Sequence, residues 1–354
     1  MPLGRGDARY SNKVTVASLN FSLARLSAVL GACALALAAV LMLAAGFGEQ
    51  PLSLPEVFEE GSAARSILLS IRLPRVALAA LVGASLAASG CTLQALTRNP
   101  LADPFVLGVS GGSALGATVA LALGLSASAL LPGLSVTSLF ALGGAFGATA
   151  LVMAVGRLSR GGPHATLLAG VIFNSFALAA VLFVKALVAP DQLGEVLYWL
   201  AGRLGHEQGT TLVGATVLEA IAFAGMWSLS GKLNLLMLGD DDAASLGVDV
   251  RRTRAQVLLA TSLAVSVAVA VSGLVGFVGL LVPHVVRLLF GADNRLLLPA
   301  SALCGGAFLA LADLLARVSF RAFNQELPVG VVTALIGGPL FLALLVRASR
   351  QRAG

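Results

Sequence analysis

The sequence predicts an all-α, polytopic membrane protein that crosses the bilayer about ten times. Its 354 residues are 58% hydrophobic and only 11% charged, with a mean hydropathy of +0.94, whereas a soluble domain carries about 25% charged residues. The apolar runs are solid rather than alternating, and many reach the roughly 20 residues that a helix needs to cross hydrocarbon. Because backbone groups in lipid must be paired within helices or closed barrels, we expect helices throughout and treat residues 1–354 as one transmembrane domain.

Ten apolar runs are the candidate spans. They lie near residues 24–46, 75–96, 105–125, 135–156, 165–188, 210–228, 255–275, 279–291, 297–316 and 328–347. The eighth run is short for a span. Residues 1–20 are polar and basic, and no small-residue cleavage site follows them, so we expect a cytoplasmic tail rather than a secretory signal.

Basic residues are distributed unequally between the two sides of this arrangement. With the N-terminus in the cytoplasm, ten crossings return the C-terminus there, and 16 of the 23 Lys and Arg residues fall on the cytoplasmic side. The other seven lie outside and are Arg65, Arg72, Arg75, Lys185, Arg203, Arg317 and Arg321. Cytoplasmic loops are enriched in Lys and Arg. We therefore read the net charge of +6 as a mark of topology rather than of nucleic-acid binding.

Small residues recur at helical spacing within the spans. The three sets are Gly83, Ala87 and Gly90; Gly108, Gly112 and Gly116; and Gly143 and Gly147. Small residues three or four positions apart let helix backbones approach closely in lipid. We expect each set to pack against a neighbouring helix.

The sequence carries no recognisable catalytic, nucleotide-binding or metal-binding motif. It has no G-x-x-x-x-G-K-[ST] loop, no H-E-x-x-H pair and no G-x-S-x-G elbow. Cys33, Cys91 and Cys304 lie within apolar runs without metal-ligand or disulfide spacing, so we expect them to serve in helix packing. The chain is therefore not expected to be an enzyme or to hold a cofactor.

Two carboxylates lie within predicted spans, Glu219 midway along the sixth and Asp313 near the outer end of the ninth. Charge in hydrocarbon is costly and usually faces a partner or a water-filled path. A structural hydrogen bond or ion pair is one interpretation. The other is a role in permeation, which would make the chain an ion-coupled secondary transporter.

The longest cytoplasmic segment, residues 231–254, is too polar to span the membrane. Asp240 to Asp242 predict the start of a short helix, because acids favour helix N-termini, and Gly247 is placed to end it. The segment is either a solvated loop with a capped turn or an amphipathic projection on the cytoplasmic face that fits a partner protein. The apolar contacts of such a projection would be Leu235, Leu236, Leu238 and Leu246.

Three long motifs resemble one known family. They read "IRLPRVALAALVGASLAASGCTLQALTRNPLADPFVLGVSGGSALGA" at the second span, "LGDDDAASLGV" in the cytoplasmic segment and "ELPVGVVTALIGGPLFLALL" at the last span. Together they look like the membrane permease of ATP-binding-cassette importers for ferric siderophores, haem and cobalamin, the FecCD-like family. The resemblance extends from about residue 20 to residue 350.

The resemblance implies a multi-pass protein of the bacterial inner membrane with both termini in the cytoplasm. It implies ten helices per subunit and a homodimer that encloses a central translocation pathway and works by alternating access. Two separate cytoplasmic ATPase subunits would bind ATP and Mg, and a periplasmic binding protein would deliver the chelate.

The resemblance also assigns roles to individual residues. It places Asn99 and Leu101 at the cytoplasmic gate, and Arg72, Arg75 and Arg317 at the docking site of the binding protein. It assigns coupling to the ATPase to Gly239, Asp240, Asp241, Asp242, Ala243, Leu246 and Gly247.

Arg203 departs from the family pattern, because a small polar residue is expected at its position. An arginine at the outer mouth can attract an anionic ligand, which makes Arg203 a candidate for the substrate entrance. It can equally pair with Glu207 one turn further on.

Overall fold

The computed structural model describes residues 23–48, 54–125, 129–131, 134–158, 162–187, 194, 198–205 and 209–353. The regular secondary structure of the described part is helical apart from one short antiparallel hairpin, in which β1 (Ala129–Leu131) pairs with β2 (Leu134–Ser135). The predicted helical fold class is thus confirmed, with this hairpin as an addition.

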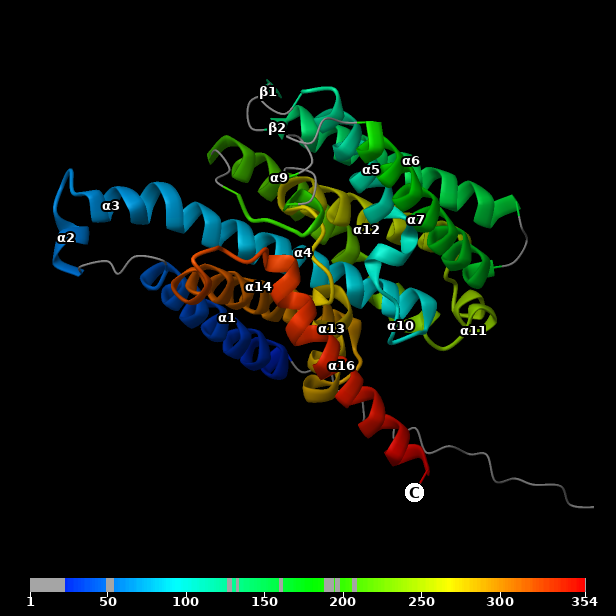
Figure 1. Cartoon of the computed structure of the whole chain (residues 1–354). Helices are drawn as coiled ribbons and strands as arrows, with labels where there is room; N and C mark the ends of the chain where they lie inside the picture. Colours follow the sequence, from blue (N-terminus) through cyan, green and yellow to red (C-terminus); the bar gives the residue numbers. More distant parts are fainter. Residues whose placement is uncertain are drawn as a thin grey trace, which may run out of the picture.

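Each of the ten predicted spans coincides with one helix (Figure 1). These are α1 (Leu23–Gly46), α4 (Leu73–Thr97), α5 (Val109–Ala122), α6 (Val136–Leu158), α7 (Gly162–Leu187), α9 (Gly209–Ser228), α12 (Val250–Ser272), α13 (Val278–Phe290), α14 (Asn294–Val318) and α16 (Val329–Ala353). Among the described residues, six helices are long and apolar enough to cross a membrane, and four further apolar helices are shorter. The number of crossings stays a prediction.

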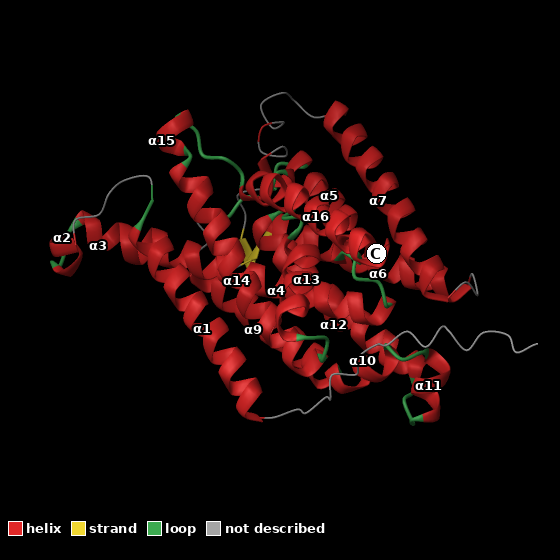
Figure 2. Ribbon diagram, turned by 90° about the horizontal axis from the view of Figure 1, so that it is seen from below, coloured by secondary structure: helices red, strands yellow, loops and turns green. Residues whose placement is uncertain are grey.

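Short helices mark the two ends of the bundle. They are α2 (Leu54–Phe58), α3 (Ala63–Ile67), the π-helical turn η1 (Leu68–Arg72), the 3-10 turn η2 (Pro104–Leu107), α10 (Ser230–Leu236), α11 (Asp240–Ser245) and α15 (Phe320–Phe323). In Figures 1 and 2, α2 and α3 lie at one end, and α10 and α11 lie at the other. After the predicted orientation, we call these the outer end and the inner end.

The second span begins earlier than its predicted first residue, 75. Helical structure runs without a break through α3, η1 and α4, from Ala63 to Thr97. Pro74 has no N–H to donate to the preceding turn, and the five-residue π-helical turn lies directly before α4. A proline near the start of an apolar run is therefore not a helix boundary here.

Helix α4 is the central element and is buried along nearly its whole length. It crosses α14 at Gly83 and Gly305, and it crosses α13 at Gly90 and Gly279. At each crossing, a side chain on the α4 glycine would overlap a backbone carbonyl of the partner helix. The first predicted set of small residues is therefore confirmed as a packing surface, with Ala87 beside Gly305.

The other two sets had different outcomes. Gly112 packs on Gly144 and Gly116 packs on Phe140, where α5 meets α6. The prediction for Gly143 and Gly147 is not confirmed, because a Cβ added at either position would meet no described residue within 4 Å, and Gly144 makes the contact with α5 instead.

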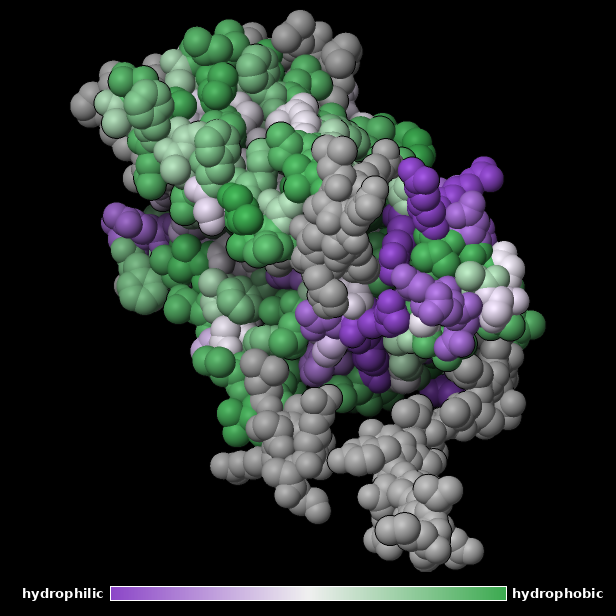
Figure 3. Space-filling model, turned by 90° about the vertical axis from the view of Figure 1, so that its right-hand side faces the viewer, coloured by the Kyte–Doolittle hydropathy of each residue, from purple (hydrophilic) through white to green (hydrophobic). Residues whose placement is uncertain are grey.

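The surface of the bundle is largely apolar. Large hydrophobic side chains such as Leu35, Phe183 and Val213 are mostly exposed, as expected for helices whose outer faces meet lipid. Figure 3 views the molecule from the side on which α11 lies in Figure 1, and hydrophilic residues gather in one zone of that face. On this face, polar surface is thus concentrated in one zone.

Candidate functional site

A buried ion cluster joins α4 and α14 at the outer end. Asp313 is completely buried, and its Oδ1 accepts hydrogen bonds from Nε and Nη2 of Arg75 at 2.9 and 2.8 Å. Its Oδ2 accepts from Nε of Arg317, one turn along α14, at 2.9 Å. Arg75 also pairs with Glu326. The structural interpretation of Asp313 is therefore confirmed: it is a buried ion-pair partner of two arginines.

Two arginines of the outer end also cap α1. Arg72 and Arg317 donate hydrogen bonds of 2.8 to 3.2 Å to backbone carbonyls of residues 44–47 at the end of this helix. The last carbonyls of a helix have no intrahelical donors and carry partial negative charge. The two guanidinium groups therefore satisfy these carbonyls and fasten α1 to the rest of the bundle.

This capping bears on the predicted docking site. A docking arginine needs a guanidinium group that a partner protein can reach, but Arg72 and Arg317 are only 5% and 6% exposed. Arg75 is partly exposed and lines a surface cavity. Docking stays a prediction for all three residues, and the geometry favours Arg75 over the other two as a direct contact.

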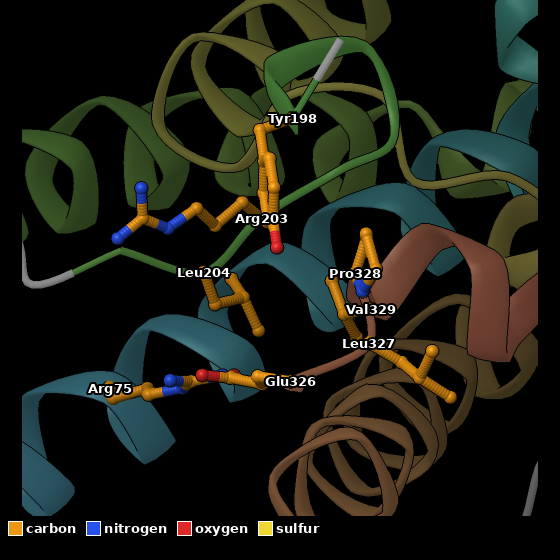
Figure 4. A pocket seen from close by; sticks show the side chains of 8 residues that line it. All are labelled: Arg75, Tyr198, Arg203, Leu204, Glu326, Leu327, Pro328 and Val329. Carbon is orange, nitrogen blue, oxygen red and sulfur yellow. The ribbon is translucent and has the colours of Figure 1, made fainter. Parts of the chain in front are cut away.

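The cavity beside Arg75 has a volume of about 260 Å³. It is lined by Arg75, Tyr198, Arg203, Leu204, Glu326, Leu327, Pro328 and Val329. Figure 4 shows the Tyr198 hydroxyl pointing toward the Arg75–Glu326 pair, while the Arg203 side chain extends away from them. The exposed Arg203 guanidinium has no ion pair with any described residue. Glu207, its predicted alternative partner, lies outside the described residues.

Close backbone contacts hold residues 198–205 against the rest of this end. Gly202 and Gly273 both have positive φ, of 76° and 67°. A side chain at Gly202 would overlap the carbonyl of Leu274, and one at Gly273 would overlap that of Trp199. Only glycine combines this backbone conformation with so close an approach. The position of Tyr198 and Arg203 at the cavity is thus fixed by the backbone.

At the inner end, α4 stops at Arg98 in a Schellman motif. Arg98 has left-handed φ and ψ of 54° and 29°, a conformation in which glycine is usual. Its N–H donates to Ala95, and the N–H of Asn99 donates to Gln94, at 3.3 and 3.1 Å. This turn starts the segment that contains the predicted gate residues.

Two side-chain acceptors shape the following turn. Asn99 Oδ1 accepts from the N–H of Leu101 at 2.9 Å, and Asp103 Oδ1 accepts from the N–H of Phe105 at 2.8 Å. Burial raises the pKa of the Asp103 carboxyl to about 6, against the lowering effect of its hydrogen bond to Phe105. Asn99 and Leu101 are exposed, so they are accessible to a pathway or a partner. Gating itself stays a prediction.

Asn174 on α7 also shapes this turn, a role that no sequence motif predicted. Its Nδ2 donates to the carbonyl of Phe105 at 2.7 Å, and its Oδ1 accepts from the N–H of Gly111 at 3.0 Å. The residue thereby joins α7 to the segment between η2 and α5. A lone asparagine in an otherwise apolar run was the available signal.

Residues 231–254, the predicted cytoplasmic segment, contain the predicted short helix. Helix α11 begins at Asp240, and Gly247 follows its end with a φ of 85°. The N–H groups of Gly247 and Val248 donate to the carbonyls of Ala244 and Ala243, both at 3.0 Å. Acids at the N-terminus and a left-handed glycine after the C-terminus are thus confirmed as helix signals.

The predicted contact residues of this segment divide into two groups. Leu238 and Leu246 are 62% and 59% exposed and flank α11. Leu236 and Ala243 are buried, and Leu235 is partly buried against the core. The predicted contact role is therefore wrong for Leu236, because its buried side chain holds α10 on the bundle. The role of Ala243 in coupling stays a prediction.

Asp240 differs from the two aspartates that follow it. Its Oδ1 accepts from Nη2 of Arg98 at 2.9 Å. Nη2 of Arg254, on α12, lies 2.8 Å from both carboxylate oxygens of Asp240. Asp241 and Asp242 are exposed and form no ion pair with another described residue. Asp240 therefore connects α11 to the gate turn, residues 98–101, which contains the predicted gate residues.

A further polar network, also missed from the sequence, holds α10 to the start of α14. Asn234 Nδ2 donates to Asp293 Oδ1 at 2.7 Å, and the backbone N–H and Nδ2 of Asn294 donate to Asn234 Oδ1 at 2.9 and 2.8 Å. Asp293 is also the N-cap of α14. The segment before α11 is thus fixed to a core helix.

Glu219 lies on α9, is buried, and its Oε1 has no hydrogen-bond partner among the described residues. The other member of the predicted permeation pair, Asp313, is held by two arginines as described above. The two carboxylates are therefore in different environments, and a joint role in permeation stays a prediction. No group of three or more His, Cys, Asp or Glu that could hold a metal occurs in the part of the chain that the structure describes.

Comparisons with known proteins agree over nearly the whole chain. A model of the FecCD transport family matches residues 29–347. The hemin transport system permease protein HmuU of Yersinia pestis is 41% identical over 289 residues, which cover 81% of this chain and 85% of that protein. The cobalamin import system permease protein BtuC of Halobacterium salinarum is 41% identical over 291 residues, which cover 82% of this chain and 76% of that protein.

The fold is similar to that of a solved transporter as well. An inward-facing conformation of a metal-chelate type ABC transporter superposes with a TM-score of 0.81 at 32% sequence identity. The match covers 90% of this chain and 99% of that chain. The resemblance predicted from the three sequence motifs is confirmed by these matches.

Proposed function

Because the chain belongs to the FecCD transport family, we propose that it is the membrane permease of an ATP-binding-cassette importer that carries a metal chelate. Relatives named for haemin and cobalamin, and a neighbour described as a metal-chelate transporter, support this substrate class. The cargo is a ferric siderophore, haem or a cobalamin.

The working unit is a homodimer in the bacterial inner membrane, with ten helices per copy and both termini in the cytoplasm. Two ATPase subunits bind ATP and Mg at the inner end, and a periplasmic binding protein delivers the chelate at the outer end. The distribution of Lys and Arg along the sequence supports this orientation. The hydrophilic zone on the face near α11 is consistent with this end lying outside the hydrocarbon (Figure 3).

One observation carries the assignment of an ATPase partner. Helix α11 is short, begins with three aspartates, ends before a left-handed glycine and is flanked by two exposed leucines, Leu238 and Leu246, at the polar inner end. Exposed leucines on a hydrophilic face are well suited to fill a groove of a partner protein. The neighbouring Asp241 and Asp242 supply the polar rim.

Transport proceeds by alternating access. The ATPase subunits bind nucleotide more tightly in one conformation than in another, and only such a difference in affinity can shift the equilibrium of the permease. Movement of α11 then opens or closes the gate at Asn99 and Leu101. The permease performs no covalent chemistry, and its walls release the cargo because they bind it weakly.

The outer end receives the binding protein and the cargo. Arg75, beside the cavity, is the direct docking contact, while Arg72 and Arg317 support it by holding α1 and Asp313 in place. Arg203 lies at the rim of the same cavity, and its guanidinium group has no ion pair with a described residue. It attracts anionic groups of the chelate at the entrance.

The ATPase assignment is tested by purifying the tagged chain from its native membrane in mild detergent. We expect a stoichiometric ATPase subunit to accompany the wild type and to be lost from Leu246→Asp. Leu123→Asp, which changes an exposed leucine at the end of α5, is the matched control and should keep the ATPase. A clean homo-oligomer without ATPase would contradict the proposal and favour the alternative, an ion-coupled transporter that uses Glu219.

The cargo is tested in proteoliposomes that contain the whole complex with its binding protein. Haemin, cyanocobalamin and a ferric siderophore are supplied outside, and ATP is supplied inside. We expect ATP-dependent accumulation of one chelate class. Accumulation driven by a proton or sodium gradient without ATP would overturn the importer assignment.

A further inference from the structure

We propose that Asp240 is a positioning residue that transmits displacement of the coupling helix α11 to the gate turn through its ion pair with Arg98. This inference rests on the proposed function, because it assumes that an ATPase moves α11. It assigns Asp240 a different role from the one the sequence suggested. The residue acts inside the permease and is not primarily a contact to the ATPase.

The geometry brings three separate elements to one carboxylate. Asp240 is the first residue of α11, Arg98 ends α4, and Arg254 lies in the second turn of α12. Both arginines bond Asp240 Oδ1, at 2.9 and 2.8 Å, and Arg254 also bonds Oδ2 at 2.8 Å. Since Arg98 and Asp240 are 142 residues apart in the chain, this is a tertiary link rather than a local turn.

The ion pair of Asp240 ends at Arg98, the residue at which the chain turns out of α4. Arg98 holds the left-handed conformation that stops α4, and Asn99 and Leu101 follow directly, joined by the hydrogen bond from the Leu101 N–H to Asn99 Oδ1. A force on the Arg98 side chain therefore acts on the residue from which the gate turn departs. Coupling through packed or hydrogen-bonded neighbours requires such a contiguous contact.

The exposure of the three side chains suits a contact that changes during transport. The side chains of Arg98, Asp240 and Arg254 are 40%, 37% and 23% exposed. Ion pairs that water can reach contribute little to stability, so this link can form and break at low cost. The deeper contacts of the segment, at Asn234 and Ala243, instead hold its base in place.

The test uses the whole complex in nanodiscs and a reporter in the gate turn. Cys33, Cys91 and Cys304 are first replaced by alanine, and Leu101→Cys is introduced as the site of labelling. A hydrophilic maleimide then measures the accessibility of this thiol without nucleotide and with ATP plus vanadate. The nucleotide is the only ligand required, so the readout does not depend on the identity of the chelate.

The variants separate the link from a general structural effect. Asp240→Asn removes the charge, Asp240→Glu restores it, and Arg98→Gln removes the other partner. Arg251→Gln is the matched control, since this arginine is exposed on α12 and forms no ion pair with a described residue. ATPase co-purification and ATP hydrolysis are measured for every variant.

We expect the labelling rate of the thiol introduced by Leu101→Cys to change at least several-fold with ATP plus vanadate in the parent and in Arg251→Gln. The change should be lost in Asp240→Asn and Arg98→Gln, with ATPase still bound and active, and should return in Asp240→Glu. Combining Asp240→Asn with Arg98→Gln should add no further loss.

Two results would overturn the inference. One is an Asp240→Asn complex that responds to nucleotide like the parent. The other is selective loss of the ATPase from Asp240→Asn, which would make Asp240 a partner contact. Failure of the proposed function is distinct, because then no ATPase accompanies the parent or its labelling ignores nucleotide.

Discussion

Gln94 on α4 bonds the backbone of α13 one turn before Pro283. Its Nε2 lies 3.1 Å from the carbonyl oxygen of Leu280 and 3.5 Å from that of Gly279. Pro283 has no N–H, so the carbonyl of Gly279 lacks its usual intrahelical donor. The buried amide of Gln94 thus repairs a hydrogen-bonding deficit inside the bundle, at the place where α4 and α13 cross at Gly90 and Gly279.

This relationship predicts that Gln94→Leu destabilises the protein by about 1–3 kcal/mol, the cost of a buried acceptor left without a partner. The measurement is the apparent midpoint of thermal unfolding in detergent. Pro283→Ala provides the control, because an alanine at this position has a backbone N–H that can bond the carbonyl of Gly279. Gln94→Leu should therefore cost less in that background, and equal costs in both would show that the two residues act independently.

Close helix crossings make a second prediction. A Cβ at Gly90 would overlap the backbone of Gly279, whereas a Cβ at Gly143 meets open space. Gly90→Ala should force α4 and α13 apart and cost at least the roughly 1–3 kcal/mol of an overpacked core. Gly143→Ala should be close to neutral. The folded fraction on size-exclusion chromatography in detergent distinguishes them, and similar losses in both variants would contradict the assigned crossing.

The outer ion cluster makes a third prediction. Asp313→Asn leaves Arg75 with Glu326 alone and deprives the buried Arg317 of its carboxylate. Breaking a buried pair from one side costs about 3–5 kcal/mol, so we expect a large fall in thermal stability. Glu60→Gln is the control, because Glu60 is exposed and its oxygen lies 3.7 Å from Arg65. If both variants unfolded alike, the Asp313 ion pairs would not be important for stability.

The positions of the helices were predictable from the sequence, because a continuous apolar run of about 20 residues can pair its backbone groups in lipid only as a helix. The capped helix at Asp240 was also predictable, since its signals are local and lie within eight residues. The roles of Arg72 and Arg317 were not, because their acceptors lie on α1, more than 25 residues away for Arg72 and about 270 away for Arg317.

Two predictions about single positions also failed because long-range packing, which the sequence does not show directly, decided them. Leu236 and Leu238 are chemically identical, and only the packing of α10 on the core buries the first and exposes the second. Gly143 and Gly144 are adjacent glycines, and the rotation of α6 decides which one meets α5. Residue type sets what a position can do, while long-range packing decides which of two equivalent positions does it.

Asp103 makes the last prediction, which concerns pH. Burial raises the pKa of this carboxyl to about 6 from a reference value of 3.8. Between these two values the folded protein binds more protons than the unfolded chain. The contribution of Asp103 to the free energy of unfolding is therefore full below about pH 4 and is lost as pH rises through 6.

Asp103→Asn keeps the side-chain oxygen that caps η2 but removes the titration. Its thermal midpoint should be close to that of the wild type near pH 4 and should exceed it progressively toward pH 7. The measurement is thermal unfolding of both proteins in detergent from pH 4 to 8. Asp249→Asn, at an exposed N-cap of α12, is the matched control. A difference in thermal midpoint between wild type and Asp103→Asn that stays constant across this range would show that folding does not raise the pKa of this carboxyl.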